Sequence, residues 1–122
     1  MSNQNNKKNK TRYFIRGRGI SSSDPIYLID SIYKLEYEFR EGHIGSFTEL
    51  RASISLVGID VAQQQEIISD ISSKGSIAFR VPQTGRYIFQ TQMKFFDTLK
   101  PRSNVMADTN EVWWDMDCKI IE

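Results

Sequence analysis

The feature that most constrains the fold of this chain is a strict alternation of apolar and charged side chains over Ser31–Arg40. The apolar members are Tyr33, Leu35, Tyr37 and Phe39, and the charged members are Lys34, Glu36, Glu38 and Arg40. Successive side chains of a β-strand point to opposite faces, so the segment is predicted to be a strand with one buried and one solvated face. Such a strand is typical of an antiparallel sheet that is covered on one side.

Four further segments carry a strand signal. Thr11–Arg18 is aromatic at its centre, and Glu111–Ile121 alternates along the end of the chain. Between them, Ser76–Val81 and Arg86–Phe96 flank Pro82–Gly85, a segment whose length and whose proline and glycine placement are typical of a hairpin connection. We therefore expect these two inner segments to pair as a β-hairpin. In the last segment Val112, Trp114, Met116, Cys118 and Ile120 are expected to share the inward side.

Two segments favour helices. Ser46–Val57 has a capping serine, a glutamate three residues later, and apolar residues at helical spacing, although Leu50, Ala52, Ile54 and Leu56 also alternate as in a strand. Asp60–Ser73 has a capping aspartate and ends at Lys74-Gly75. The sequence thus predicts an α+β fold: an antiparallel sheet of about five strands with one or two helices packed on one face.

The chain is predicted to hold one globular α+β domain over residues 12–122, preceded by a disordered basic arm over residues 1–11. The net charge of +1 conceals an asymmetry, because residues 1–23 carry six basic residues and no acidic one. A basic arm of this kind suits an anionic partner. The start of the chain lacks the apolar core of a secretory signal, and there is one cysteine, so an intracellular location is expected.

Catalysis is poorly supported by the sequence. The one histidine, His43, lies in a glycine-flanked loop, and Cys118 alternates with inward residues beside two aspartates. One histidine and one cysteine are too few for a structural zinc site, and a catalytic histidine needs an orienting partner that is not evident. We therefore expect a non-enzymatic protein with no catalytic residues, no metal and no cofactor.

Binding to nucleic acid is better supported. The predicted contact residues are Lys7, Lys8, Lys10, Arg12, Arg16, Arg18, Arg80, Arg86 and Lys94. Arg16-Gly17-Arg18-Gly19 is an Arg-Gly repeat beside aromatic residues, in which arginine binds phosphate and glycine allows close approach. Arg80, Arg86 and Lys94 are expected to form a basic stripe on the open face of the predicted hairpin. The alternative is an ordinary charged loop for the Arg-Gly repeat and an ordinary solvated face for the hairpin residues.

Trp113 is expected to point outward, because its neighbour Trp114 belongs to the inward set. An outward tryptophan favours a partner interface, since tryptophan is enriched among interface hot spots. The alternative is a second small core beneath a helix or the long loop.

The order of segments resembles the matrix proteins of rhabdoviruses. The resemblance rests on the lysine-rich start, the aromatic strand before the helix predicted at 46–57, Lys74-Gly75-Ser76-Ile77, and Trp114-Asp115. It covers about half of the chain, which is shorter than such proteins and lacks their proline-rich late-domain motifs. The resemblance implies self-association, binding to a ribonucleoprotein and peripheral membrane contact.

The leading hypothesis is therefore a self-associating viral structural protein, matrix-like or coat-like, that binds nucleic acid or nucleoprotein through its basic arm. A short basic arm on a β-rich body is also how small coat proteins are built. The alternative is a nucleic-acid-binding accessory protein, of the silencing-suppressor or movement type, that uses a basic sheet face.

Overall fold

The computed structural model describes residues 11–41, 48–71, 73–97 and 109–121. These residues form eight β-strands and one short 3-10 turn, η1 (Thr109–Glu111). The strands are β1 (Arg12–Arg18), β2 (Ile26–Leu28), β3 (Ser31–Glu41), β4 (Thr48–Gly58), β5 (Gln64–Ile71), β6 (Lys74–Val81), β7 (Gly85–Asp97) and β8 (Val112–Ile120). The prediction of an α+β fold is wrong, because the described residues contain no α-helix. No helix among them has the length and apolar character needed to cross a membrane.

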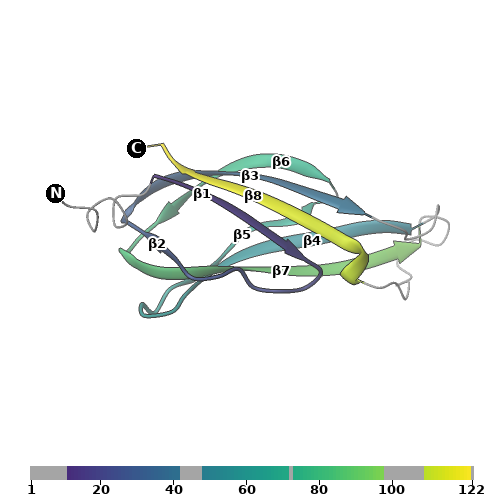
Figure 1. Ribbon diagram of the computed structural model, residues 1–122, viewed down its shortest axis with the longest axis horizontal. Helices are drawn as coiled ribbons and strands as arrows, with labels where there is room; N and C mark the ends of the chain where they lie inside the picture. The colour runs from purple at the N-terminus through teal and green to yellow at the C-terminus, as the bar shows by residue number, and fades with distance from the viewer. Residues whose placement is uncertain (1–10, 42–47, 72, 98–108, 122) are drawn as a thin grey trace.

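The strands form two four-stranded antiparallel sheets that lie one above the other (Figure 1). The first sheet has the order β1-β8-β3-β6, and the second has the order β2-β7-β4-β5. Four of the strand pairs are those expected when one long hairpin is rolled into two layers: β1/β8, β2/β7, β3/β6 and β4/β5. In addition, β3 pairs with β8 in the first sheet, and β4 pairs with β7 in the second. This order defines an eight-stranded jelly roll.

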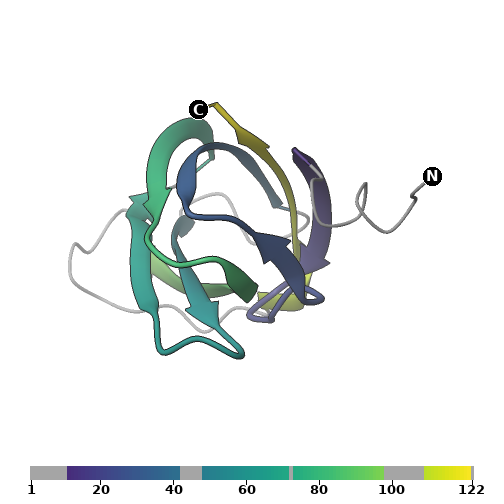
Figure 2. The same ribbon diagram turned by 90° about the vertical axis from the view of Figure 1, so that its left-hand side faces the viewer.

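The core lies between the two sheets, which wrap around it when the molecule is seen end-on (Figure 2). Alternate residues point inward in β1, β3, β4, β6, β7 and β8, and the largest side chains that are fully buried are those of Trp114, Tyr33, Tyr87 and Phe89. Burying one large apolar side chain contributes roughly 1.5–3 kcal/mol, so this layer is the main source of stability. The strands expected at Thr11–Arg18, Ser31–Arg40, Ser76–Val81, Arg86–Phe96 and Glu111–Ile121 are present as β1, β3, β6, β7 and β8, although Glu111 belongs to η1 and β8 begins at Val112.

The predicted helix at Ser46–Val57 is wrong, and the strand alternative is correct. Leu50, Ala52, Ile54 and Leu56 are all buried, as the alternation requires. Leu50 and Ile54 satisfy both patterns, because residues four apart share a face in a strand as well as in a helix. The supposed capping residue Ser46 lies outside the described residues.

The helix predicted at Asp60–Ser73 is wrong as well, since Gln64–Ile71 forms β5. The pairing of β5 with β4 has two register shifts, one on either side of the Ile54–Ile68 pair. Such irregularities break the strict two-residue alternation. Ile67, Ile68 and Ile71 therefore all pack at the core with a spacing that resembles a helix.

Asp60, expected to cap that helix, instead fixes the start of β7. Its Oδ1 accepts a hydrogen bond from the backbone N–H of Arg86 at 2.8 Å, and its Oδ2 accepts one from Nε of Arg86 at 3.1 Å. These contacts hold the pKa of the Asp60 carboxyl below its usual range.

The expected hairpin between Ser76–Val81 and Arg86–Phe96 does not form. The two segments are strands β6 and β7, but β6 lies in the first sheet and β7 in the second. The connection Pro82–Thr84 therefore passes from one layer to the other. This crossing matters for function because it places the outward residues of the two strands on opposite faces of the molecule.

Candidate functional site

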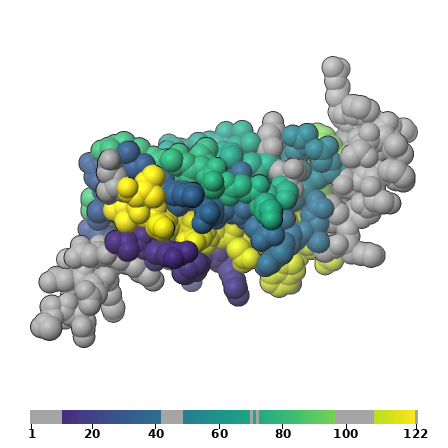
Figure 3. Space-filling model, turned by 90° about the horizontal axis from the view of Figure 1, so that it is seen from above, coloured from purple at the N-terminus to yellow at the C-terminus, as the bar shows by residue number. Residues whose placement is uncertain are grey.

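The outer face of the first sheet gathers most of the charged side chains that the sequence analysis singled out. Space-filling Figure 3 looks onto the side of the molecule where β1, β8, β3 and β6 lie. Eight exposed basic side chains point outward from these four strands, against four acidic ones. The basic residues are Arg12, Arg16, Arg18, Lys34, Arg40, Lys74, Arg80 and Lys119, and the acidic residues are Glu36, Glu38, Asp115 and Asp117.

The arginines of β1 are held by partners on β8. Arg12 donates two hydrogen bonds to Asp117, from Nε at 3.0 Å and from Nη2 at 2.7 Å. This pairing holds the pKa of the Asp117 carboxyl below its usual range. Nε of Arg16 lies 3.3 Å from Oδ1 of Asp115. Oδ2 of the same aspartate lies 2.8 Å from Nη2 of Arg40 on β3.

Two aromatic rings lie open on the same face. Trp113 is 50% exposed and Phe14 is 72% exposed, which confirms the predicted outward orientation of Trp113. The guanidinium of Arg18 lies 4.8 Å from the Trp113 ring centroid, and that of Arg12 lies 4.7 Å from the Phe14 centroid. The face therefore combines exposed rings with stacked cations.

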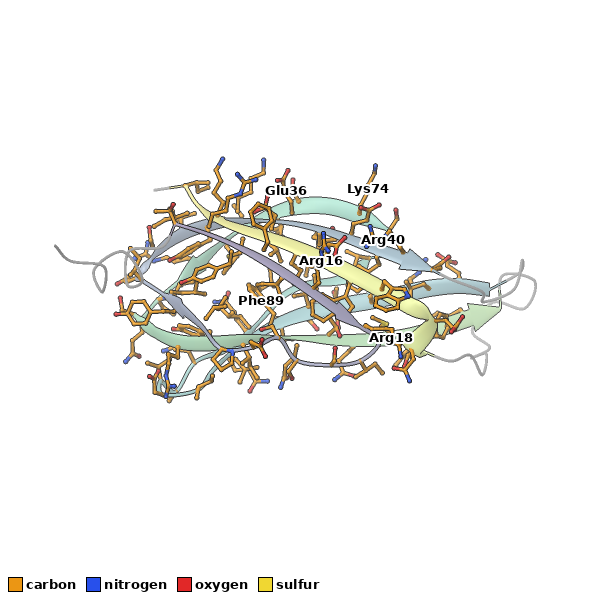
Figure 4. All side chains as sticks on the ribbon, in the orientation of Figure 1. Arg16, Arg18, Glu36, Arg40, Lys74 and Phe89 are labelled. Carbon is orange, nitrogen blue, oxygen red and sulfur yellow. The ribbon has the colours of Figure 1, made fainter. Side chains whose placement is uncertain are left out.

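A hollow of about 900 Å³ crosses the middle of this face. Its floor is acidic, because Glu36 lies opposite Asp117 and Glu38 lies opposite Asp115 across the β3–β8 pair. Its two ends are formed by Arg16 with Phe14 on β1 and by Lys74 on β6. In Figure 4, Glu36 and Lys74 extend from the outer side of the first sheet, whereas Phe89 lies between the sheets.

The remaining predicted contact residues are not brought together. Arg80 lies on the first sheet and is ion-paired with Asp30. Arg86 and Lys94 lie on β7 in the second sheet, so the predicted basic stripe of Arg80, Arg86 and Lys94 is wrong. The outer face of the second sheet is mainly uncharged along its middle, with Ser53, Ser55, Gln90 and Gln92 side by side. Lys7, Lys8, Lys10 and His43 lie outside the described residues.

The glycines of the Arg-Gly repeat have structural roles. Gly17 faces inward, where an added Cβ would lie 2.1 Å from the indole ring of Trp114. Gly19 has a positive φ of 66°, and its carbonyl oxygen accepts hydrogen bonds from Trp114 Nε1 at 3.0 Å and from Thr91 Oγ1 at 2.8 Å. The interpretation that these glycines allow close approach to a ligand is therefore replaced by a role in packing.

Cys118 is buried, as its alternation with inward residues predicts. Burial, with a smaller contribution from Asp117, raises the pKa of its thiol to about 12. Within the ranges that the structure describes, no three His, Cys, Asp or Glu side chains are grouped so that they could hold a metal ion.

Sequence reasoning missed Phe14, Arg40, Lys74, Glu36 and Glu38 as parts of one surface. Their outward orientation was visible for β3, where the alternation is strict. Their proximity was not visible, because it depends on the pairing of β1 with β8 and of β8 with β3.

Comparison with known proteins adds remote likenesses only. The sequence matches no protein-family model and no curated protein. The structure of the infectious bursal disease virus VP2 subviral particle aligns with a TM-score of 0.43 and 14% identity, over 90% of this chain and 30% of that one. The present chain thus spans about a third of its length.

Two other solved structures are similarly distant. The P-domain of Macrobrachium rosenbergii nodavirus aligns with a TM-score of 0.30 and 11% identity, over 89% of this chain and 92% of that one. The Drosophila melanogaster CENP-C cupin domain aligns with a TM-score of 0.35 and 10% identity, over 93% of this chain and 58% of that one. The resemblance to rhabdovirus matrix proteins gains no support here, and the helix on which it partly relied is strand β4.

Proposed function

We propose that this protein is a non-enzymatic viral structural protein of the coat type, which self-associates and binds nucleic acid or nucleoprotein through its basic N-terminal arm. The observation that carries the proposal is the eight-stranded jelly-roll order, in which β1 follows directly from the lysine-bearing segment of residues 1–11. Jelly rolls occur in viral capsids, lectins and cupins, so the fold narrows the class by analogy only.

The packing of the interior supports a coat-type role over an enclosed ligand site. Trp114, Tyr33 and Phe89 are buried between the two sheets, in a core of mainly apolar side chains. A domain of this kind offers its outer faces and edges to partners. The raised pKa of the buried Cys118 thiol also disfavours a nucleophilic role for that residue. Action inside a host cell, with peripheral membrane contact, belongs to the same proposal.

The test is the size of the full-length protein with and without RNA, measured by light scattering and electron microscopy. We expect large regular particles or oligomers whose formation is promoted by RNA and weakened by salt, because phosphate contacts are salt-dependent. The variant Lys7→Gln/Lys8→Gln/Lys10→Gln should lose the RNA effect and keep the unfolding midpoint. A monomer at every concentration, with and without RNA, would contradict the proposal.

The second candidate is a nucleic-acid-binding accessory protein that does not assemble. The excess of basic over acidic side chains on the outer face of the first sheet favours it. Salt-dependent RNA binding by a species that remains a monomer or dimer would support this candidate over a coat protein.

A further inference from the structure

The two exposed rings on the outer face of the first sheet are arranged as stacking platforms. Phe14 and Trp113 each carry an arginine guanidinium over the ring, at 4.7 and 4.8 Å from the centroids. A guanidinium is a flat group. Its position over each ring shows that this face of the ring can be reached from solvent and covered by a flat group. Nucleobases are flat groups that stack on aromatic rings and on arginine, and they do so with little regard to sequence.

The two rings also lie at a useful separation. Trp113 is opposite Arg18, which is four residues along β1 from Phe14. At the rise of an extended strand this corresponds to roughly 13 Å along the sheet. Arg16 lies between them on the same face, so a single strand that reaches both rings passes a basic side chain.

The hollow that runs from Phe14 and Arg16 on β1 to Lys74 on β6 has an acidic floor that is incompletely neutralised. Asp115 and Asp117 have arginine partners, whereas the ion pair that Glu36 forms among the described residues is with Lys34, at 3.9 Å. In the part of the chain that the structure describes, no ion pair to Glu38 is formed. Because like charges directly opposite each other on a sheet are destabilising, the carboxylates gain from any donor that enters the hollow.

Nucleobases supply such donors. The amino groups of cytosine, adenine and guanine donate hydrogen bonds, and carboxylates are suited to accept from the cytosine amino group. Uracil has a carbonyl oxygen at that position and does not offer this contact. Phosphates, in contrast, suit the basic side chains at the margins of the hollow, among them Arg16, Arg40 and Lys74.

We propose that the outer face of the β1-β8-β3-β6 sheet binds single-stranded nucleic acid, with bases stacked on Phe14 and Trp113 and base amino groups directed to Glu36 and Glu38. The inference rests on the nucleic-acid binding of the proposed function and adds a site distinct from the arm. A second copy of the same face is the less favoured occupant. It would bring the same excess of positive charge against this one, and like charges repel.

The first test uses the full-length protein and a fluorescently labelled single-stranded oligonucleotide, with binding followed by anisotropy. Phe14→Ser and Trp113→Ser should each weaken binding about tenfold, the range expected for loss of one stacked base. Ile59→Ser is the matched control, because Ile59 is an exposed apolar residue (44%) that follows β4 of the other sheet, and its replacement should change nothing. Unfolding midpoints in urea verify that each variant folds.

Tryptophan fluorescence gives a second readout. The chain has two tryptophans, and Trp114 is only 1% exposed, so a base that stacks on Trp113 should quench part of the emission. Trp113→Phe should abolish this quenching and still bind, because a stacking ring remains. Persistent quenching in that variant would contradict the assignment of Trp113.

The carboxylates are tested by base preference. Oligo(C) should bind about fivefold more tightly than oligo(U), a difference near the lower limit for one base contact. Glu38→Gln should reduce this preference, because an amide presents a donor as well as an acceptor. Equal affinity of the wild-type protein for the two oligonucleotides would contradict the role given to Glu36 and Glu38.

The outcomes separate the site from the function. If the wild-type protein binds no oligonucleotide, the proposed function and this inference both fail. If binding is lost in the variant with glutamine at positions 7, 8 and 10 but unchanged in the Phe14 and Trp113 variants, the function stands and the sheet-face site is wrong. If Phe14→Ser instead abolishes self-association and leaves RNA binding intact, the face is a protein interface.

Discussion

The substitution Gly17→Ala tests whether the Arg-Gly repeat is built for the core. Gly17 lies on the inner side of β1, directly opposite Trp114. An alanine methyl would lie 2.1 Å from Cζ2 and 2.5 Å from Cε2 and Cη2 of the indole. The ring is 1% exposed, and its Nε1 donates a hydrogen bond to Gly19 at 3.0 Å. It cannot move aside without breaking that bond or displacing its neighbours.

The expected cost can be assembled from these contacts. Overpacking a core typically costs about 1–3 kcal/mol, and weakening one buried hydrogen bond adds about 1 kcal/mol. Replacing glycine by alanine within a strand recovers roughly 0.5–1 kcal/mol. Gly17→Ala should therefore lower the free energy of unfolding by about 2 kcal/mol, which at a typical slope is a urea midpoint lower by about 1 M.

Urea unfolding of the full-length protein, followed by far-UV circular dichroism, measures this change. The matched control is Gly75→Ala on β6, whose new methyl would meet only the hydroxyl end of the Tyr37 ring, at 2.7 Å. We expect a smaller loss there, because the end of a side chain moves more readily than an enclosed indole. An unchanged or higher midpoint for Gly17→Ala would refute the packing role of the repeat.

Three further predictions concern titratable groups. Because burial raises the pKa of Cys118 to about 12, its reaction with a thiol reagent at pH 8 should follow the unfolded fraction in urea, and fast reaction without urea would contradict burial. Arg12 lowers the folded-state pKa of Asp117, so this pair stabilises the fold above the usual aspartate range and loses its effect as the pH falls through the lowered pKa. The difference in unfolding midpoint between wild type and Arg12→Gln should therefore shrink below about pH 4. Asp60→Ala should lower the urea midpoint more than Arg86→Gln, because only the first removes the acceptor of the β7 backbone N–H.

The individual strands were predictable because alternation is a local property. Tyr33, Leu35, Tyr37 and Phe39 are inward in the structure, as their spacing requires, and Cys118 is buried as expected. The layer arrangement was not predictable in the same way. Pairing of the first strand with the last depends on contacts between residues about a hundred positions apart, for which the sequence has no local signal.

The errors have identifiable physical causes. Aspartate is favoured both at helix starts and wherever a carboxylate meets a backbone N–H, and Asp60 uses the second possibility at Arg86. Register shifts in β5 placed Ile67, Ile68 and Ile71 against the core at a spacing that resembles a helical face. Pro82–Gly85 has the composition of a hairpin turn, yet it joins strands of different sheets. In each case the local sequence pattern is compatible with two structures, and tertiary packing selected the one that was not predicted.

The Arg-Gly repeat shows how one motif serves two surfaces. Alternation along β1 sends Gly17 against Trp114 in the core and sends Arg16 and Arg18 to the outer face. Pairing with β8 places Trp113 beside Arg18 on the outer face of the sheet and Trp114 against Gly17 on the inner face. The two adjacent tryptophans therefore contact two adjacent residues of the repeat on opposite sides of the sheet. A change at either glycine should therefore act first on stability, whereas a change at either arginine should act first on binding. The two effects are separable by measuring unfolding and oligonucleotide affinity on the same variants, and a common loss of both in Arg18→Gln would show that the outer face also supports the fold.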